Sequence, residues 1–507
     1  MCGSVFVVFS LETMYDECIE RILSVKTDKN IKQSLRQINY GFWTLIKNFK
    51  KLFTDYRKKY IIHFGIVWKD KSFERKYLMR RTEIMPGVNL NTIDSEKFKT
   101  NFFSVCFVVP LEKENAHLNA LVSKVLLRGC RNYPDIASIS KRLEFLYASA
   151  ISPIYVKRAQ SLIIGLSVEF LKDAYLPKGE KLLNDAVKLV FELLFEPLVS
   201  DGKFKEDYTE SEKIDLINTI NAKINNKASY AKERCAEVMF GAHPYGLSEL
   251  GTVEEVKNAS ARQVYDRYLH IINNAPAEIF FNGECDREYL EGLISSGFPS
   301  SRNRLQKFPG REFLDGAPDE ITEVTDEMPV AQGKLVMGMR MSGINVCSEN
   351  AGAFALFNEI FGGSPSSKLF VHVREEMSLC YYCRSMPDMF MSAMFVSAGI
   401  ETENRDKACD AILAQLDAMK NGEFSEEDIS DAKRSLANSY RELDDNAAAK
   451  CLWYLSRIIF GSLEEPQAVS EKIMNVTAAQ ITEAANSVSL DSVYFIKGTG
   501  LAREENN

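Results

Sequence analysis

An internal repeat constrains this chain more than any single motif. The segment Asp201-Gly-Lys-Phe204-Lys-Glu206 resembles Asn421-Gly-Glu-Phe424-Ser-Glu426. The same offset then pairs Lys213 with Lys433, Leu216 with Leu436 and Phe240-Gly241 with Phe460-Gly461. A repeat of this length is typical of two copies of one structural unit. We therefore predict two homologous domains, residues 81–305 and 334–507.

Both copies run through their elements in the same order. Each begins with a strand-like segment rich in β-branched and aromatic residues, at 101–109 and at 334–341. Apolar residues at helical spacing follow, as at Leu118, Leu121 and Val125. Strands grouped ahead of helices indicate an α+β fold, here a mainly antiparallel sheet covered by helices in each domain. Between the copies, residues 306–333 are rich in proline, glycine and acidic residues and predict a linker.

The composition excludes several classes of protein. Hydrophobic residues make up 46% and charged residues 26% of the chain, which is typical of a folded globular protein. A net charge of −8 gives no reason to expect a nucleic-acid binder, and no apolar run is long enough to span a membrane. The 11 cysteines are scattered without an export signal, so we expect reduced thiols and a cytoplasmic location.

Residues 1–80 differ from the rest of the chain in charge. The segment 1–81 has 17 Lys and Arg against 8 Asp and Glu, often beside aromatic residues. A basic amphipathic segment could contact a membrane surface or nucleic acid. It could equally be a dispensable extension, or a stretch upstream of a true start at Met79. We expect this extension not to be part of the core.

Several phrases of the sequence resemble one family. They are Gly87-Val-Asn-Leu-Asn-Thr92, Leu126-Leu-Arg-Gly129, Phe240-Gly-Ala-His-Pro-Tyr-Gly246, Phe361-Gly-Gly-Ser-Pro-Ser-Ser-Lys-Leu-Phe370 and Val373-Arg-Glu-Glu376. Over about residues 80–503 the chain resembles the pitrilysin/insulinase family of zinc metallopeptidases. The resemblance implies paired α+β domains that face each other as a clamshell and bind unfolded peptides. More narrowly, the chain is similar to the partner subunits of bacterial two-subunit members, including those associated with elongation factor P modification.

The zinc motif of that family is degenerate here. Catalytic members carry His-x-x-Glu-His on an early helix, where two His bind zinc and the Glu activates water. Counted back from Gly129, the motif positions fall on Ala120, Ser123 and Lys124, none of which can replace the family's residues. Lys124 would place a cation near the seat of the metal.

The family's distal glutamate is also in doubt. A Glu-x6-Glu spacing from Glu212 ends on Thr219, and one from Glu210 ends on Ile217. We therefore expect no metal site in this chain. Restoring the three motif residues alone should not create a full enzyme, because a third ligand would still be needed.

No other pattern replaces the lost motif. None of the five His lies three or four residues from another. Cys380-Tyr-Tyr-Cys383 is a lone Cys-x-x-Cys, and on a regular strand its two sulfurs would point to opposite faces. We interpret these cysteines as packing residues.

One element of the family's substrate site is retained. Catalytic complexes use an Arg and a Tyr seven residues apart to hold the substrate near zinc, and Arg374 and Tyr381 have that spacing. A guanidinium and a phenol can donate hydrogen bonds to a scissile carbonyl. The alternative is an Arg paired with a nearby acid and a Tyr packed on a strand. Gly362 and Gly363 begin a loop that could guide a peptide or simply connect helix and strand.

These features support three hypotheses. In the first, the chain is the metal-free, substrate-binding subunit of a cytoplasmic heterodimeric peptidase, inactive alone, whose related partner carries His-x-x-Glu-His and the zinc. In the second, it is a non-catalytic scaffold that binds a peptide or protein. The third hypothesis is an independent metallopeptidase with an unrecognised site. The five His argue against it, because no two of them have the spacing of a metal site. Whether the chain counts as an enzyme is left open by the sequence.

Overall fold

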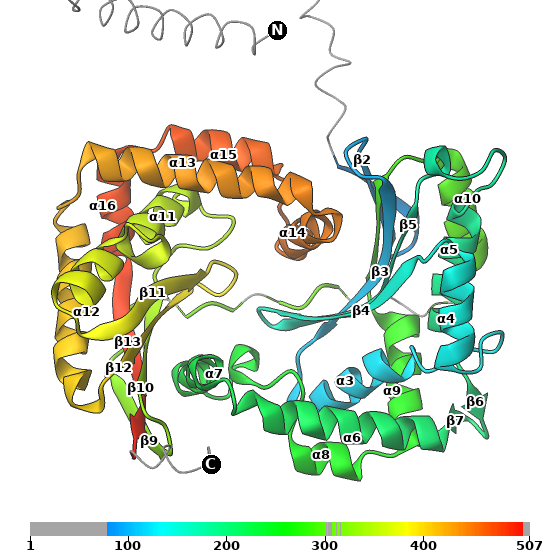
Figure 1. Cartoon of the computed structure of the whole chain (residues 1–507), viewed down its shortest axis with the longest axis horizontal. Helices are drawn as coiled ribbons and strands as arrows, with labels where there is room; N and C mark the ends of the chain where they lie inside the picture. Colours follow the sequence, from blue (N-terminus) through cyan, green and yellow to red (C-terminus); the bar gives the residue numbers. More distant parts are fainter. Residues whose placement is uncertain (1–78, 301, 303–306, 311, 315, 500–507) are drawn as a thin grey trace, which may run out of the picture. The chain divides into compact units, whose positions relative to one another are not determined.

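The described residues form an α+β protein with two mixed sheets, each covered by helices (Figure 1). The computed structural model describes residues 79–300, 302, 307–310, 312–314 and 316–499. The fold class predicted from the repeat is therefore confirmed. The basic extension lies outside the described residues, apart from its last two positions.

The first sheet has six strands in the order β1-β2-β8-β3-β5-β4. Their bounds are β1 Arg80–Met85, β2 Val88–Asp94, β3 Thr100–Pro110, β4 Ala150–Arg158, β5 Ser161–Leu171 and β8 Ala277–Gly283. All neighbours are antiparallel except β2 and β8, which run parallel. The central strands β3 and β5 are buried over almost their whole length, whereas β4 forms one edge of the sheet.

Helices cover one face of this sheet. They are α3 Ala116–Val125, α4 Ile136–Phe145, α5 Leu183–Phe195, α6 Glu206–Lys223, α8 Val253–Asn258, α9 Ala261–Asn274 and α10 Arg287–Gly297. Their apolar sides join the outward residues of the strands in one core, in which Phe103 and Phe191 meet edge to face. Within the described residues, no helix combines the length and apolar character that crossing a membrane would need.

The second sheet has five strands in the order β11-β12-β10-β13-β9. They are β9 Thr322–Met328, β10 Gly333–Met341, β11 Cys380–Asp388, β12 Ala393–Ile400 and β13 Val488–Gly498. Only β13 and β9 pair in parallel. The helices α11 Ala351–Asn358, α12 Arg405–Lys420, α13 Glu426–Glu442, α15 Pro466–Met474 and α16 Ala478–Asn486 complete this domain. Strand β9 lies inside the range 306–333 that was expected to be a linker; the exact domain boundaries stay a prediction.

The two domains exchange one helix each. The first domain's α7, Lys227–Phe240, packs on β10 and β13, and the second domain's α14, Ala447–Ile459, packs on β8. A Cβ at Gly338 of β10 would lie 3.0 Å from Met239 Sδ, so the glycine allows α7 to approach closely. The result is an apolar cluster with members from both domains, including Phe280 and Tyr454.

A buried hydrogen bond also joins the domains. Tyr245 lies in the 3₁₀ turn Pro244–Gly246 and is 9% exposed, and its hydroxyl donates to Asp388 Oδ2 over 2.8 Å. Asp388 is the last residue of β11, so the turn after α7 holds one end of that strand. Burial, and then the adjacent Asp388 carboxylate, raise the pKa of Tyr245 far above its usual range, which keeps the phenol protonated as a donor.

We predict that Tyr245→Phe lowers the free energy of unfolding by about 1–3 kcal/mol, because it leaves Oδ2 of the half-buried Asp388 carboxylate without its donor. Tyr147→Phe is the matched control, since the Tyr147 hydroxyl donates to Glu180 at an exposed site. That change should cost less than about 0.5 kcal/mol. Urea unfolding of both variants measures the difference, and equal losses would contradict a role of Tyr245 at the domain junction.

Candidate functional site

The three positions of the degenerate zinc motif lie on α3. Ala120 is 1% exposed and its methyl group offers no ligand atom. Ser123 is also buried, and its hydroxyl donates to the carbonyl oxygen of Ala120 over 2.8 Å. Lys124, one helical turn after Ala120, ends in an ammonium group, which has no lone pair for a metal while it is charged. This set of side chains does not fit a zinc ion.

Lys124 reaches a buried carboxylate on α6. The side chain of Glu212 is 8% exposed, and its Oε2 lies 3.7 Å from Lys124 Nζ. Its Oε1 accepts a hydrogen bond from Arg128 Nε, and Arg128 Nη2 donates to Ser211 Oγ over 2.9 Å. Each oxygen of the carboxylate therefore faces its own cation. The spacing from Glu212 to Thr219 in the sequence gives no sign of this contact, because it depends on how α6 packs on α3 and brings Glu212 itself to the motif.

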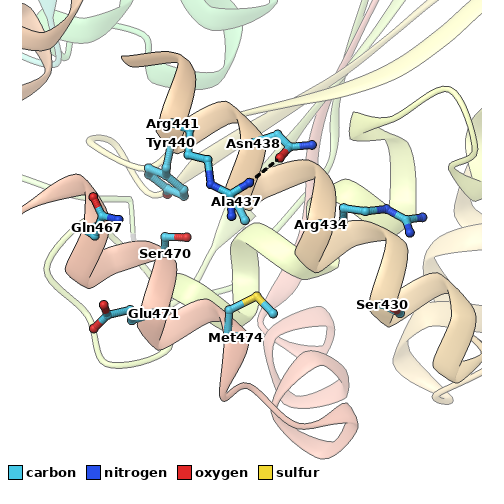
Figure 2. A pocket seen from close by; sticks show the side chains of 10 residues that line it. All are labelled: Ser430, Arg434, Ala437, Asn438, Tyr440, Arg441, Gln467, Ser470, Glu471 and Met474. Carbon is cyan, nitrogen blue, oxygen red and sulfur yellow. Dashed lines mark hydrogen bonds between the residues drawn. The ribbon is translucent and has the colours of Figure 1, made fainter. Parts of the chain in front are cut away.

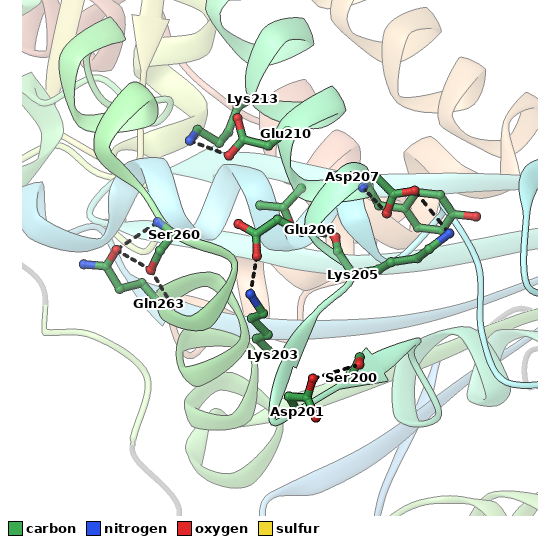
Figure 3. Close-up of polar contacts among 12 residues, drawn as sticks. Ser200, Asp201, Lys203, Lys205, Glu206, Asp207, Glu210, Lys213, Ser260 and Gln263 are labelled. Atoms are coloured by element: carbon green, nitrogen blue, oxygen red, sulfur yellow. Dashed lines mark hydrogen bonds and ion pairs between the residues drawn. The ribbon is translucent and has the colours of Figure 1, made fainter.

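The first turns of α6, the helix that carries Glu212, are fixed by a preceding hairpin and by ion pairs. The hairpin of β6, Val199–Ser200, and β7, Lys203–Phe204, leads directly into the helix. Acidic residues in the first turn favour a helix N-terminus, and Lys203 pairs with Glu206 there (Figure 3). One turn further, Lys213 pairs with Glu210. These ion pairs are partly exposed, so they fix the local helix geometry rather than supply much stability.

No alternative metal site is seen in the part of the chain that the structure describes. No group of three or more His, Cys, Asp or Glu side chains is placed there to hold a metal ion. At the motif itself, one carboxylate faces two cations, which is the opposite of a metal-binding arrangement.

Arg374 lies on a π-helical segment, Leu369–Glu376, that follows the short connection 364–368. Such segments are rare and are often found at functional sites. The guanidinium stacks on the ring of Phe370, with Cζ 4.4 Å from the ring centroid. Among the described residues, no carboxylate pairs with Arg374. The expected alternative of an internal ion pair is therefore not what the structure shows.

Tyr381 lies at the start of β11 and is 53% exposed. Its hydroxyl donates to Glu401 Oε1, and this carboxylate raises the pKa of the phenol. Arg374 and Tyr381 are not hydrogen-bonded to each other, although β11 packs on the π-helical segment. The assignment of both residues to substrate binding stays a prediction.

A β-bulge at Tyr381 corrects the interpretation of the two cysteines. In the pairing of β11 with β12, Cys380 is opposite Ile400 and Cys383 is opposite Ala398. These partners are two residues apart, so both thiols point to the same face of the sheet, not to opposite faces. Both are buried in the core, as the packing role requires. The hydrogen bond from Cys383, followed by the Arg374 charge, lowers the pKa of Cys380.

Gly362 and Gly363 end another π-helical segment, Glu359–Gly363, and do not begin a loop as the sequence suggested, because the loop starts only at Ser364. A Cβ at Gly362 would come within 2.8 Å of the backbone nitrogen of Ser385 on β11, and a Cβ at Gly363 within 3.0 Å of the Asn358 carbonyl oxygen. The structure thus gives both glycines a packing reason. A role in binding substrate stays a prediction for them.

A hollow of about 610 Å³ lies beside the edge strand β4. Its walls come from β4, α7, the turn at Tyr245 and Asp388. Lys157 of β4 donates to the carbonyl oxygens of Tyr245 and Leu247 over 2.6 and 2.7 Å, and its burial lowers the pKa of the ammonium group. Among the described residues β4 pairs only with β5, so its other backbone edge is open beside this hollow.

A second hollow, of about 430 Å³, lies between α13 and α15 (Figure 2). Arg434 and Arg441 project from α13 and Glu471 from α15. Arg434 pairs with Asp431, and Arg441 donates to Asn438. Only one domain lines this hollow, and none of the predicted site residues reaches it.

The comparisons with known proteins identify the family. The family description "Peptidase M16 inactive domain" matches residues 258–436. "Probable inactive metalloprotease YmfF" of Bacillus subtilis is 32% identical over 418 residues, which cover 82% of this chain and 96% of that protein. The chain belongs to the M16, or pitrilysin, family of metallopeptidases. The name of the Bacillus subtilis homologue carries the word inactive, in agreement with the donor set on α3, whereas the family match at residues 258–436 does not include that helix.

Solved structures of similar chains agree with this M16 fold. A conserved protein from Enterococcus faecalis has a TM-score of 0.78 and 27% identity, covering 85% of this chain and all of that one. A chain of "Complex III2 from Candida albicans, Inz-5 bound" has a TM-score of 0.63 and 15% identity, covering 84% and 97%. The second likeness shows the fold alone.

We predict that Gly362→Ala lowers the free energy of unfolding by about 1–3 kcal/mol, because the new methyl group would press on the backbone of β11. Gly292→Ala in α10 is the control, since a Cβ there meets nothing within 4 Å. It should be neutral or stabilise by up to about 1 kcal/mol. Thermal unfolding compares the two. A Gly362→Ala variant as stable as the wild type but weak in peptide binding would assign the glycine to the ligand instead.

Proposed function

We propose that this M16 protein is the metal-free, substrate-binding subunit of a heterodimeric zinc metallopeptidase. Its partner is a related chain with an intact His-x-x-Glu-His motif, and the zinc belongs to that partner. The observation that carries the proposal is an asymmetry between the two domains. The first has lost every motif ligand, at Ala120, Ser123 and Lys124, while the second keeps Arg374 without an acidic partner among the described residues.

The contacts of Arg374 support a role other than stabilising the fold. A cation that served only stability would be expected to pair with a carboxylate, yet this guanidinium stacks on the face of Phe370. Stacking fixes the plane of the group and leaves its N–H donors free for an oxygen of a peptide. Such a donor can stabilise the charge that develops on a scissile carbonyl.

The open edge of β4 offers a way to bind the peptide. An extended chain can add to a sheet edge as a further strand, with main-chain hydrogen bonds that do not depend on sequence. The adjoining hollow of about 610 Å³ has room for side chains of such a peptide. Lys157, one of several charged residues that line it, already donates to two backbone carbonyl oxygens, so the binding we propose at β4 rests on backbone contacts of the strand edge.

The finer parts of the proposal rest on the family resemblance. These are the heterodimer, the cytoplasmic location and the similarity to two-subunit members associated with elongation factor P modification. The second candidate function is a scaffold that holds a peptide or protein without cleavage. The bond from Tyr381 to Glu401 favours it, because a phenol has one proton to donate and this one is already engaged.

We predict that the chain, pulled down through a tag from its native cell, brings with it a related His-x-x-Glu-His chain and about one zinc per complex. Zinc should be low in the isolated chain. Elemental analysis of both samples, with mass spectrometry of the partner, makes the measurement. A metal-free chain that recovers no such partner would leave the scaffold as the better account.

We further predict that Arg374→Ala lowers kcat/KM of the assembled complex about 100-fold, because one donor to the oxyanion is lost. Tyr381→Phe should lower it in the same direction. Arg262→Ala and Tyr289→Phe are the matched surface controls in the first domain and should leave the rate unchanged. Size-exclusion chromatography shows that assembly is intact. Unchanged activity of both site variants in intact complexes would contradict the proposal.

A further inference from the structure

The buried carboxylate of Glu212 needs a compensating positive charge. A charged carboxylate in a protein interior is costly unless it is paired or coordinates a metal. The side chain of Glu212 is 8% exposed, while those of Lys124 and Arg128 are 32% and 23% exposed. Both cations therefore approach from the partly open side and cover the carboxylate.

We propose that Lys124 supplies, within the chain, the positive charge that a divalent metal ion would supply at this position. The position on α3 where the family binds zinc is therefore occupied by charged side chains of this chain. It is a closed electrostatic unit of one carboxylate and two cations, which repels a metal ion. This inference concerns the chain alone and holds whether or not the proposed heterodimer exists.

The two oxygens of the Glu212 carboxylate have different partners. Oε2 of Glu212 faces Lys124, and Oε1 accepts from Arg128, which Ser211 holds in place. Removal of the ammonium group would free Oε2 alone. Arg128 would remain on Oε1, in the way that outer hydrogen-bond partners orient metal-binding carboxylates.

It follows that the chain has a latent site for a divalent transition metal. Positions 120 and 124 are one turn apart on α3, the spacing at which two His on one helix face can bind one zinc ion. Glu212 would be the third ligand. From the sequence we expected that restoring the three motif residues alone would not create a full enzyme without a third ligand, and Glu212 is the third ligand that we propose.

The test uses the full chain with Ala120→His and Lys124→His together, equilibrated with zinc sulfate and then dialysed. We expect about one zinc per chain, and at least tenfold less in the wild type and in the triple variant that adds Glu212→Gln. Replacement of zinc by Co²⁺ should give the visible absorption of a tetrahedral site in the double variant only. A folded double variant that takes up no more zinc than the wild type overturns the proposal, and so does uptake that survives Glu212→Gln.

Position 120 is buried, so the double variant could fail to fold, and a second measurement avoids that problem. Thermal unfolding is compared for Lys124→Met, Glu212→Gln and the two combined, with Lys124→Arg as the charge-conserving control. We expect each single change to lower the midpoint, Lys124→Arg to lower it least, and the combined change to lower it by less than the sum. Strictly additive losses, or a Lys124→Met variant as stable as Lys124→Arg, would show that Lys124 does not compensate Glu212.

Discussion

The reciprocal packing of α7 and α14 is the interaction on which the rest of this structure depends. Each helix covers part of the sheet of the other domain, and the shared apolar cluster includes Met239 of α7 and Tyr454 of α14. Neither domain could keep its sheet covered without the other, so burial of apolar surface couples the two. The same junction brings the end of β11 against the turn that follows α7, through Tyr245 and Asp388. It thereby sets where the hollow beside β4 can form.

The charges of Glu212 and Arg374 are balanced in different ways, and the reason is electrostatic. Glu212 is enclosed by protein, so its charge must be balanced within a few ångströms, and Lys124 and Arg128 do this. Arg374 is partly exposed, and water can solvate a charge there without a partner. A buried acid therefore needs a counter-charge where no metal supplies one, whereas an Arg without a carboxylate partner on an accessible surface has no such need.

The features that could be predicted from the sequence are those that depend on residues close together in the chain. The repeat predicted two α+β domains, and the phrase Leu126–Gly129 located the degenerate motif on a helix. Both predictions depend on local sequence pattern. Contacts between elements were missed. The approach of Glu212 to Lys124 depends on how α6 crosses α3. The bulge that turns Cys380 and Cys383 to one face depends on the pairing of β11 with β12, and a strand period of two cannot reveal an inserted residue.

The proposed substrate site is not ready for chemistry in the free chain, and this bears on the choice between subunit and scaffold. The Tyr381 proton is donated to Glu401, so the phenol must release that carboxylate before it can donate to a peptide oxygen. Arg374 has no such obstacle. The negative charge of Glu401 keeps the Tyr381 phenol protonated. The same carboxylate also competes with the substrate for the hydrogen bond from that phenol. On the subunit hypothesis, a bound peptide or the partner chain must therefore displace Glu401, which ties activity to assembly. On the scaffold hypothesis the Tyr381–Glu401 bond simply persists, so the two hypotheses differ at one hydrogen bond.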